Sequence, residues 1–208
     1  MAAGLLIRSA LLNIKKGGWS MAYTYGTPEW EEAFKKMTKE RIEAKSKPFI
    51  YFSPEWVGLW EKLLQGDAKY KEVAKDWEGV VVLHVLKNPD CGVDQDMFIH
   101  MDLWHGDCRA IRYVPSEVGK NAAYVVTGTI ERWVSVGKKE LDPTKGMMQG
   151  KLKLKGDLPT IVRNVKAVLR LVETSAEVGG KFPTELSPEE VEIFRKMIKD
   201  MTTKFSIT

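Results

Sequence analysis

The chain has 208 residues, of which 44% are hydrophobic and 29% are charged. These proportions are typical of globular proteins and argue against a disordered chain and against a membrane protein. No apolar run approaches the ~20 residues of a membrane-spanning helix. The 32 basic residues are interleaved with 28 acidic ones, so the net charge of +4 predicts no nucleic-acid partner. Two cysteines are too few for a secreted disulfide framework, and we expect a cytoplasmic protein.

The first 20 residues contain no acidic residue. This composition leaves two interpretations open, a transit peptide or a natural start at Met21. If the segment is ordered in the folded protein, we expect it to dock on the rest of the chain through Leu5, Leu6, Leu12 and Ile14.

Four prolines predict the starts of helices, because each follows a residue that commonly caps a helix. The pairs are Thr27-Pro28, Ser53-Pro54, Asp142-Pro143 and Ser187-Pro188. The first two helices are expected over residues 28–45 and 54–65, and a third over residues 67–77. The last helix has a capping box of Ser187 and Glu190.

From Gly79 the hydrophobic pattern changes to a period of two, which is typical of β-strands. Strands are expected over residues 80–86, 97–104, 109–114, 122–128 and 151–155, with the first four forming an antiparallel meander. A short helix is expected over residues 130–137. The alternation in the last strand places Leu152 and Leu154 on the covered face and three lysines outward.

Apolar residues recur at helical spacing from Leu158 to Val172. This pattern predicts one amphipathic helix of about 20 residues, which Asp157 caps and Gly179-Gly180 end. Helices that flank and follow a mainly antiparallel sheet predict an α+β fold.

Cys91, His100, His105 and Cys108 are residue types that bind zinc, and they fall within 18 positions. Zinc ligands usually come in close pairs on turns, whereas His100 lies within a predicted strand and Cys91 stands alone. We therefore expect no metal site. A disulfide between Cys91 and Cys108 stays open at this stage.

His84 and His100 lie on neighbouring predicted strands, and Asp102 follows two residues later. A histidine oriented by a carboxylate is typical of a general base, but no nucleophile motif or phosphate-binding loop accompanies these residues. We expect no catalytic residues and no cofactor.

Lys151, Lys153 and Lys155 form a basic run along the last predicted strand. Strand alternation explains them as a solvated face that protects an edge strand from aggregation. Contact with an anionic head group of an acyl chain stays open as an alternative.

Residues 122–178 resemble the sterol-carrier-protein family (sterol carrier protein type two-like), most specifically in the segment ELDPTKGMMQGKLKLKGDLPTIVRNV. The family shows a short helix, a small-residue loop with proline, a pair of bulky residues and a G-K-[LIV]-K-[LIV]-x-G strand that leads into an amphipathic helix. Here these are residues 133–137, Leu141-Asp142-Pro143, Met147-Met148 and residues 150–156. With the preceding strands, the resemblance covers residues 54–178.

The resemblance implies a twisted five-stranded sheet covered on one face by helices that enclose an apolar tunnel. It further implies non-catalytic binding and transfer of a lipid or other long apolar ligand, such as a sterol or isoprenoid, a fatty acid or a fatty acyl-CoA. The alternative is an accessory substrate-presenting or dimerisation module that works with a lipid- or alkyl-metabolising enzyme. Transient membrane contact and a homodimer both stay open.

The chain departs from the family pattern at both ends. We expect an N-terminal helical extension over residues 1–53, a lipid-binding domain over 54–180 and a C-terminal helical extension over 181–208. The alternation and the helical spacing aim one set of side chains at the layer between the sheet and the amphipathic helix. The predicted ligand-binding residues are Trp133, Met147, Met148, Leu152, Leu154, Ile161, Val162 and Val165.

Overall fold

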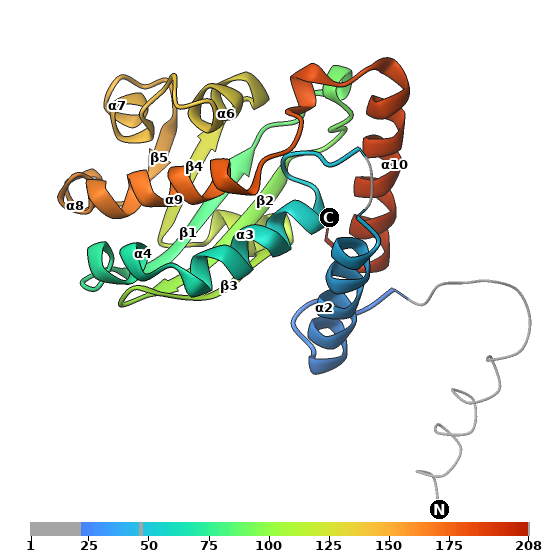
Figure 1. Ribbon diagram of the computed structural model, residues 1–208, viewed down its shortest axis with the longest axis horizontal. Helices are drawn as coiled ribbons and strands as arrows, with labels where there is room; N and C mark the ends of the chain where they lie inside the picture. The colour runs from blue at the N-terminus through green and yellow to red at the C-terminus, as the bar shows by residue number, and fades with distance from the viewer. Residues whose placement is uncertain (1–21, 46–47, 208) are drawn as a thin grey trace, which may run out of the picture.

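The computed structural model describes residues 22–45 and 48–207, and a five-stranded sheet forms its centre (Figure 1). The strands are β1 (Glu78–Val85), β2 (Met97–Trp104), β3 (Asp107–Tyr113), β4 (Tyr124–Gly128) and β5 (Lys153–Lys155). Their order in the sheet is β3-β2-β1-β4-β5. With helices before, between and after the strands, the predicted α+β fold and its mainly antiparallel sheet are confirmed.

The expected antiparallel meander is wrong at one pair, because β4 runs parallel to β1. β2 is antiparallel to both β1 and β3, so β3 and β4 point in the same direction and their connection must cross the sheet. The crossing segment contains α5 (Ser116–Lys120), a helix that the sequence analysis did not predict. It packs on β2 and β1, with Gly119 so close to Phe98 that an added side chain would overlap the ring.

One face of the sheet is covered by most of the helices between residues 54 and 178. They are α3 (Pro54–Gly66), α4 (Ala68–Val73), α6 (Ile130–Gly137), α7 (Pro143–Met148), α8 (Leu158–Arg163) and α9 (Val165–Val178). Among them, α3 and α9 contact each other and cross the sheet together (Figure 1). As predicted from the cap-and-proline pairs, Ser53 accepts a hydrogen bond from Trp56 N–H and Asp142 from Lys145 N–H.

The predicted 20-residue amphipathic helix is instead two helices, α8 and α9, that meet at Asn164. The Asn164 side chain donates a hydrogen bond to the Thr160 carbonyl at 2.9 Å, and the backbone there leaves the helical region. Asparagine competes with helix hydrogen bonding in this way, which accounts for the break. The third predicted helix is also shorter than expected, because α4 ends at Val73 and Trp77 packs into the core.

The two terminal helices, α2 (Pro28–Glu43) and α10 (Pro188–Lys204), pack together at one end of the molecule (Figure 1). Phe205, directly after α10, is fully buried against the rings of Tyr23, Trp30 and Phe34. Trp30 Nε1 donates a hydrogen bond to the Phe205 carbonyl at 2.7 Å. Short 3-10 turns, Pro89–Cys91 and Pro183–Glu185, complete the described elements.

The opposite face of the sheet carries a smaller apolar cluster of Val82, Phe98, Val114 and Val125. Both cysteines are buried free thiols, so the disulfide left open by the sequence does not form in this structure. The expected contacts of Leu5, Leu6, Leu12 and Ile14 lie outside the described residues.

Replacing Phe205 with Ala is expected to lower the free energy of unfolding by about 3 to 5 kcal/mol, because it removes a fully buried ring from an aromatic cluster. Ile193→Ala on the same helical segment is the matched control, since Ile193 is 45% exposed and its loss is expected to change stability by less than about 0.5 kcal/mol. Urea unfolding measures both. Equal losses for the two variants would show that the terminal helices are not held by this cluster.

Candidate functional site

An apolar cavity of about 90 Å³ lies between the covered face of the sheet and the helices. The sheet contributes Val81, Leu83, Met101, Leu103 and Val126, and α9 contributes Ala167, Val168, Leu171, Val172 and Ser175. The strand residues alternate, so that the side chains between them face the other side. Among the described residues that line the cavity, none is charged.

Aromatic side chains form one wall of the cavity. They are Tyr51, Phe52, Trp56, Trp60, Tyr70 and Trp77, from α3, α4 and the segments beside them. The rings of Trp56 and Trp60 lie 5.2 Å apart, and Tyr51 lies 4.8 Å from Trp56. The sequence analysis left these residues out of the site. The spacing of Trp56 and Trp60, four positions apart on a predicted helix, was the signal that could have placed them together.

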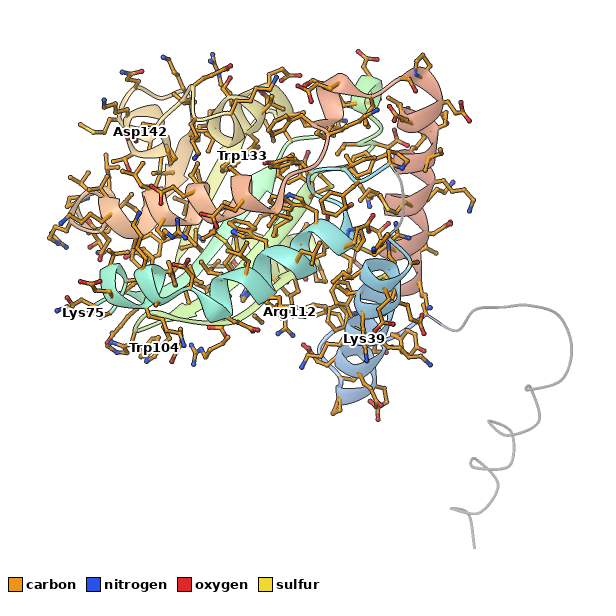
Figure 2. All side chains as sticks on the ribbon, in the orientation of Figure 1. Lys39, Lys75, Trp104, Arg112, Trp133 and Asp142 are labelled. Carbon is orange, nitrogen blue, oxygen red and sulfur yellow. The ribbon has the colours of Figure 1, made fainter. Side chains whose placement is uncertain are left out.

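The opposite wall contains three of the predicted ligand-binding residues, Trp133 from α6, Met147 from α7 and Ile161 from α8. Trp133, labelled in Figure 2, is anchored by a hydrogen bond from its Nε1 to the His84 carbonyl on β1, at 3.3 Å. The structure therefore brings these three side chains to a single cavity from three separate short helices.

The other five predicted residues lie around this wall rather than in it. Leu152 is buried against Gly128 and Gly146, Leu154 is half-buried against the core, and Val165 is half-buried on α9. Met148 and Val162 face solvent, with 65% and 42% of their surfaces exposed. Each directly follows a cavity-lining residue on its helix, Met147 or Ile161, and consecutive helical side chains point about 100° apart. Ligand contact by the eight residues stays a prediction.

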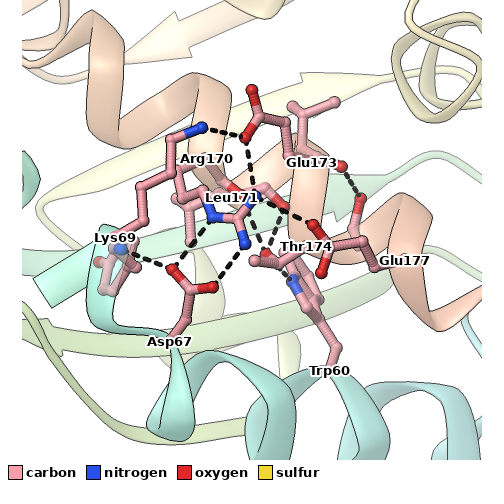
Figure 3. Close-up of polar contacts among 11 residues, drawn as sticks. Trp60, Asp67, Lys69, Arg170, Leu171, Glu173, Thr174 and Glu177 are labelled. Atoms are coloured by element: carbon pink, nitrogen blue, oxygen red, sulfur yellow. Dashed lines mark hydrogen bonds and ion pairs between the residues drawn. The ribbon is translucent and has the colours of Figure 1, made fainter.

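Polar contacts join α9, which contributes to the cavity wall, to the end of α3 (Figure 3). Arg170 Nε donates a hydrogen bond to Asp67 Oδ1 at 3.0 Å, and Arg170 Nη2 donates one to Asp67 Oδ2 at 2.5 Å. Arg170 Nη1 donates hydrogen bonds to Glu173 and Glu177. One turn away, Trp60 Nε1 donates to Thr174 Oγ1 at 3.0 Å. We call the Arg170–Asp67 and Trp60–Thr174 pairs the clasp.

Electrostatics favour the closed clasp at neutral pH. The hydrogen bonds from Arg170 lower the pKa of Asp67 below its ordinary value of 3.8. A carboxyl whose pKa is depressed by folding stabilises the folded state above its unfolded pKa, and that stabilisation is lost as the pH falls through the folded pKa.

The histidines weighed as acid–base groups lie on the opposite face of the sheet from the cavity. His84 contacts Thr127 at 3.0 Å and Asp96 at 2.9 Å, and its ring stacks on Phe98. Burial lowers the pKa of His100, so the neutral imidazole is favoured. In the described part of the chain, neither His84 nor His100 lines the apolar cavity.

The cysteines and histidines weighed as metal ligands are not gathered either. Within residues 22–45 and 48–207, no three histidine, cysteine, aspartate or glutamate side chains come together in an arrangement that could hold a metal ion. Burial raises the pKa of the Cys108 thiol to about 12, so this group is a neutral thiol at physiological pH. In the same described residues, no helix has the length and apolarity needed to cross a membrane.

Fold and site together define an α+β domain with an internal apolar cavity between its sheet and its helices. Residues 60–170 match the SCP-2 sterol transfer family. The match spans more than half of the chain, and the chain belongs to this family of lipid-binding domains. It begins within α3 and ends within α9, so α2 and α10 lie outside it.

Two solved structures, with 29% and 28% sequence identity to this chain, share its fold. A crystal structure of sterol carrier protein 2 is 29% identical, with a TM-score of 0.55, and the alignment covers 59% of this chain and 95% of that chain. The solution structure of a conserved hypothetical protein from Thermus Thermophilus is 28% identical, with a TM-score of 0.59, and covers 65% of this chain and 94% of that chain. No curated protein matches the chain in sequence.

Replacing Asp67 with Asn keeps an acceptor for the Tyr70 N–H but removes the charge that Arg170 binds. We expect the free energy of unfolding to fall by about 1.5 to 3 kcal/mol at neutral pH, the range for hydrogen bonds to charged groups. The difference from wild type should shrink as the pH falls from the unfolded-state pKa of Asp67, about 3.8, through its lower folded-state pKa, where folded wild-type Asp67 also becomes protonated.

Urea unfolding of both proteins at neutral and acid pH measures this difference. Glu177→Gln is the control, because Glu177 is 48% exposed and Arg170 keeps its other partners, so a change of at most about 1 kcal/mol is expected. A loss for Asp67→Asn that is independent of pH would show that the ion pair does not hold the clasp.

Proposed function

We propose that the protein binds one long apolar molecule, a fatty acid, fatty acyl thioester, sterol or isoprenoid, in the cavity between the sheet and α3 and α9, and carries it without chemical change. The observation that carries the proposal is the composition of the cavity wall, where the described side chains other than Ser175 are apolar or aromatic and none is charged. Such a wall attracts hydrocarbon through the hydrophobic effect, and its described side chains include no carboxylate, histidine, lysine or cysteine.

The relatives point in the same direction. The family to which the chain belongs is described as a sterol transfer family, and the crystal structure of 29% identity is of sterol carrier protein 2. The matched segment contains most of the cavity wall, including Trp60, Met147 and Ile161.

The size of the cavity bears on how a ligand is held. At about 90 Å³ it is smaller than the ~300 to 1,000 Å³ of typical small-molecule sites. A long ligand therefore requires α9 and α3 to move apart, with the clasp as the contact that opens. Met147 and Met101 in the wall favour such adaptation, because methionine is unbranched and flexible.

The adjacent residues Met147 and Met148 provide a matched test. Met147 is 8% exposed and lines the cavity, whereas Met148 is 65% exposed. Met147→Ala is expected to weaken binding of a fluorescent fatty-acid probe about tenfold, equivalent to ~1.4 kcal/mol of lost contact, and Met148→Ala to leave it unchanged.

Probe titration and displacement measure binding, and thermal unfolding checks that both variants are folded. Met147→Leu nearly conserves side-chain volume and is expected to restore most of the binding. If the wild-type protein binds no apolar probe, or if the two alanine variants bind it equally, the cavity is not the ligand site.

A further inference from the structure

The end of the molecule that carries α7 and α8 has an unusual concentration of positive charge. Residues 138–166 contain eight lysines and arginines but three acidic residues, a net charge of +5 in a chain whose total is +4. All eight basic residues are exposed. Within the part of the chain that the structure describes, Lys145, Lys151 and Lys166 form no ion pair, so their charges are available to a partner.

The acidic residues of this segment leave its net charge positive, although Asp157 pairs with Arg163 at 3.8 Å. Asp142 and Asp157 accept hydrogen bonds from the backbone N–H groups of Lys145 and Thr160, at the starts of α7 and α8. Glu140 is the remaining carboxylate of residues 138–166.

Exposed apolar side chains lie among these basic residues. Met148, Val162 and Leu169 are three of the six large hydrophobic residues that are exposed in the described part of the chain. Met148 closes α7, Val162 lies on α8 and Leu169 lies on α9. In Figure 1, α7 and α8 lie at the same end of the longest axis, opposite α2 and α10. We call Met148, Val162, Lys145, Lys151, Arg163 and Lys166 the α7–α8 surface.

This surface is the outer side of the cavity wall. Met147 and Ile161 line the cavity, and the next residue after each, Met148 and Val162, faces solvent. Met148 and Val162 therefore lie on the solvent side of the same two short helices that contribute Met147 and Ile161 to the cavity.

We propose that the α7–α8 surface docks the protein on the surface of an anionic lipid bilayer, with Met148 and Val162 inserted among the head groups and the basic residues over the phosphates. Basic residues are attracted to anionic lipids, and exposed apolar side chains add insertion into the head-group region. The inference rests on the proposed function, because docking here places the cavity wall against the membrane from which an apolar ligand would be taken.

The test is sedimentation of the full-length protein with phosphatidylcholine vesicles, with and without phosphatidylserine. The wild type is expected to bind the vesicles that contain phosphatidylserine and to lose binding at high salt, because the screening length falls from ~10 Å at 0.1 M to ~3 Å at 1 M ionic strength. The variant Lys151→Glu/Lys166→Glu is expected to bind them at least about tenfold more weakly. Met148→Ser is expected to weaken vesicle binding, because it removes an inserted apolar side chain. It should change the salt dependence of vesicle binding less than Lys151→Glu/Lys166→Glu does, because it leaves the basic residues in place.

Lys35→Glu/Lys199→Glu is the matched control, because it makes the same change of net charge on α2 and α10 at the other end of the molecule. It is expected to retain most of the vesicle binding. If it loses as much as the α7–α8 variant, the attraction is a property of total charge and the docking surface is refuted.

Probe binding in solution separates this inference from the proposed function. Lys151→Glu/Lys166→Glu should bind the fatty-acid probe as the wild type does. A wild-type protein that binds the probe but no anionic vesicle overturns the docking surface and leaves the proposed function standing. A self-association in ultracentrifugation that the α7–α8 variant abolishes would identify a second copy of the chain as the occupant and would also overturn it.

Discussion

The contact between α3 and α9 over the sheet is the constraint on which the site depends. The covered face of the sheet is apolar along every strand, so two helices must lie across it, and these helices come from segments more than a hundred residues apart. Packing alone would bring their apolar sides together. The pairs Arg170–Asp67 and Trp60–Thr174 fix how closely they approach, and the volume left beneath them is the cavity. The same contact therefore contributes to stability and bounds the cavity.

The added terminal helices bear on the site although they lie outside the family match. Glu55 is 1% exposed in the first turn of α3, and its carboxylate pairs with Arg41 of α2 at 2.6 Å. A buried carboxylate is stable only with its partner in place, so α2 holds the start of α3. The next residue, Trp56, belongs to the aromatic wall. Arg41 also contacts Met197, which ties α10 to the same point. The additions thus support one wall of the cavity.

Much of the fold could be predicted from local signals in the sequence. Cap residues before proline gave the starts of four helices, and the period-two pattern gave five strands. The parallel pairing of β4 with β1 could not be predicted from the sequence. It depends on a crossing segment whose helix, α5, is five residues long, which is too short to show a helical hydrophobic period. In the site, helical spacing indicated Ile161, and the resemblance to the family indicated Trp133 and Met147; all three line the cavity. Met148 and Val162 face outward because each directly follows a helical residue, Met147 or Ile161, that points into the cavity, and consecutive helical side chains point about 100° apart.

The central claim, that the cavity holds one apolar molecule, is tested most directly by native mass spectrometry of protein purified from its own host, followed by extraction and identification of the bound lipid. We predict a complex of one protein with one molecule that carries a long acyl, sterol or isoprenoid group, and a loss of that complex in Met147→Ala relative to Met148→Ala. Protein that carries no such molecule, and that takes up none when incubated with a lipid extract of the same host, would contradict the account.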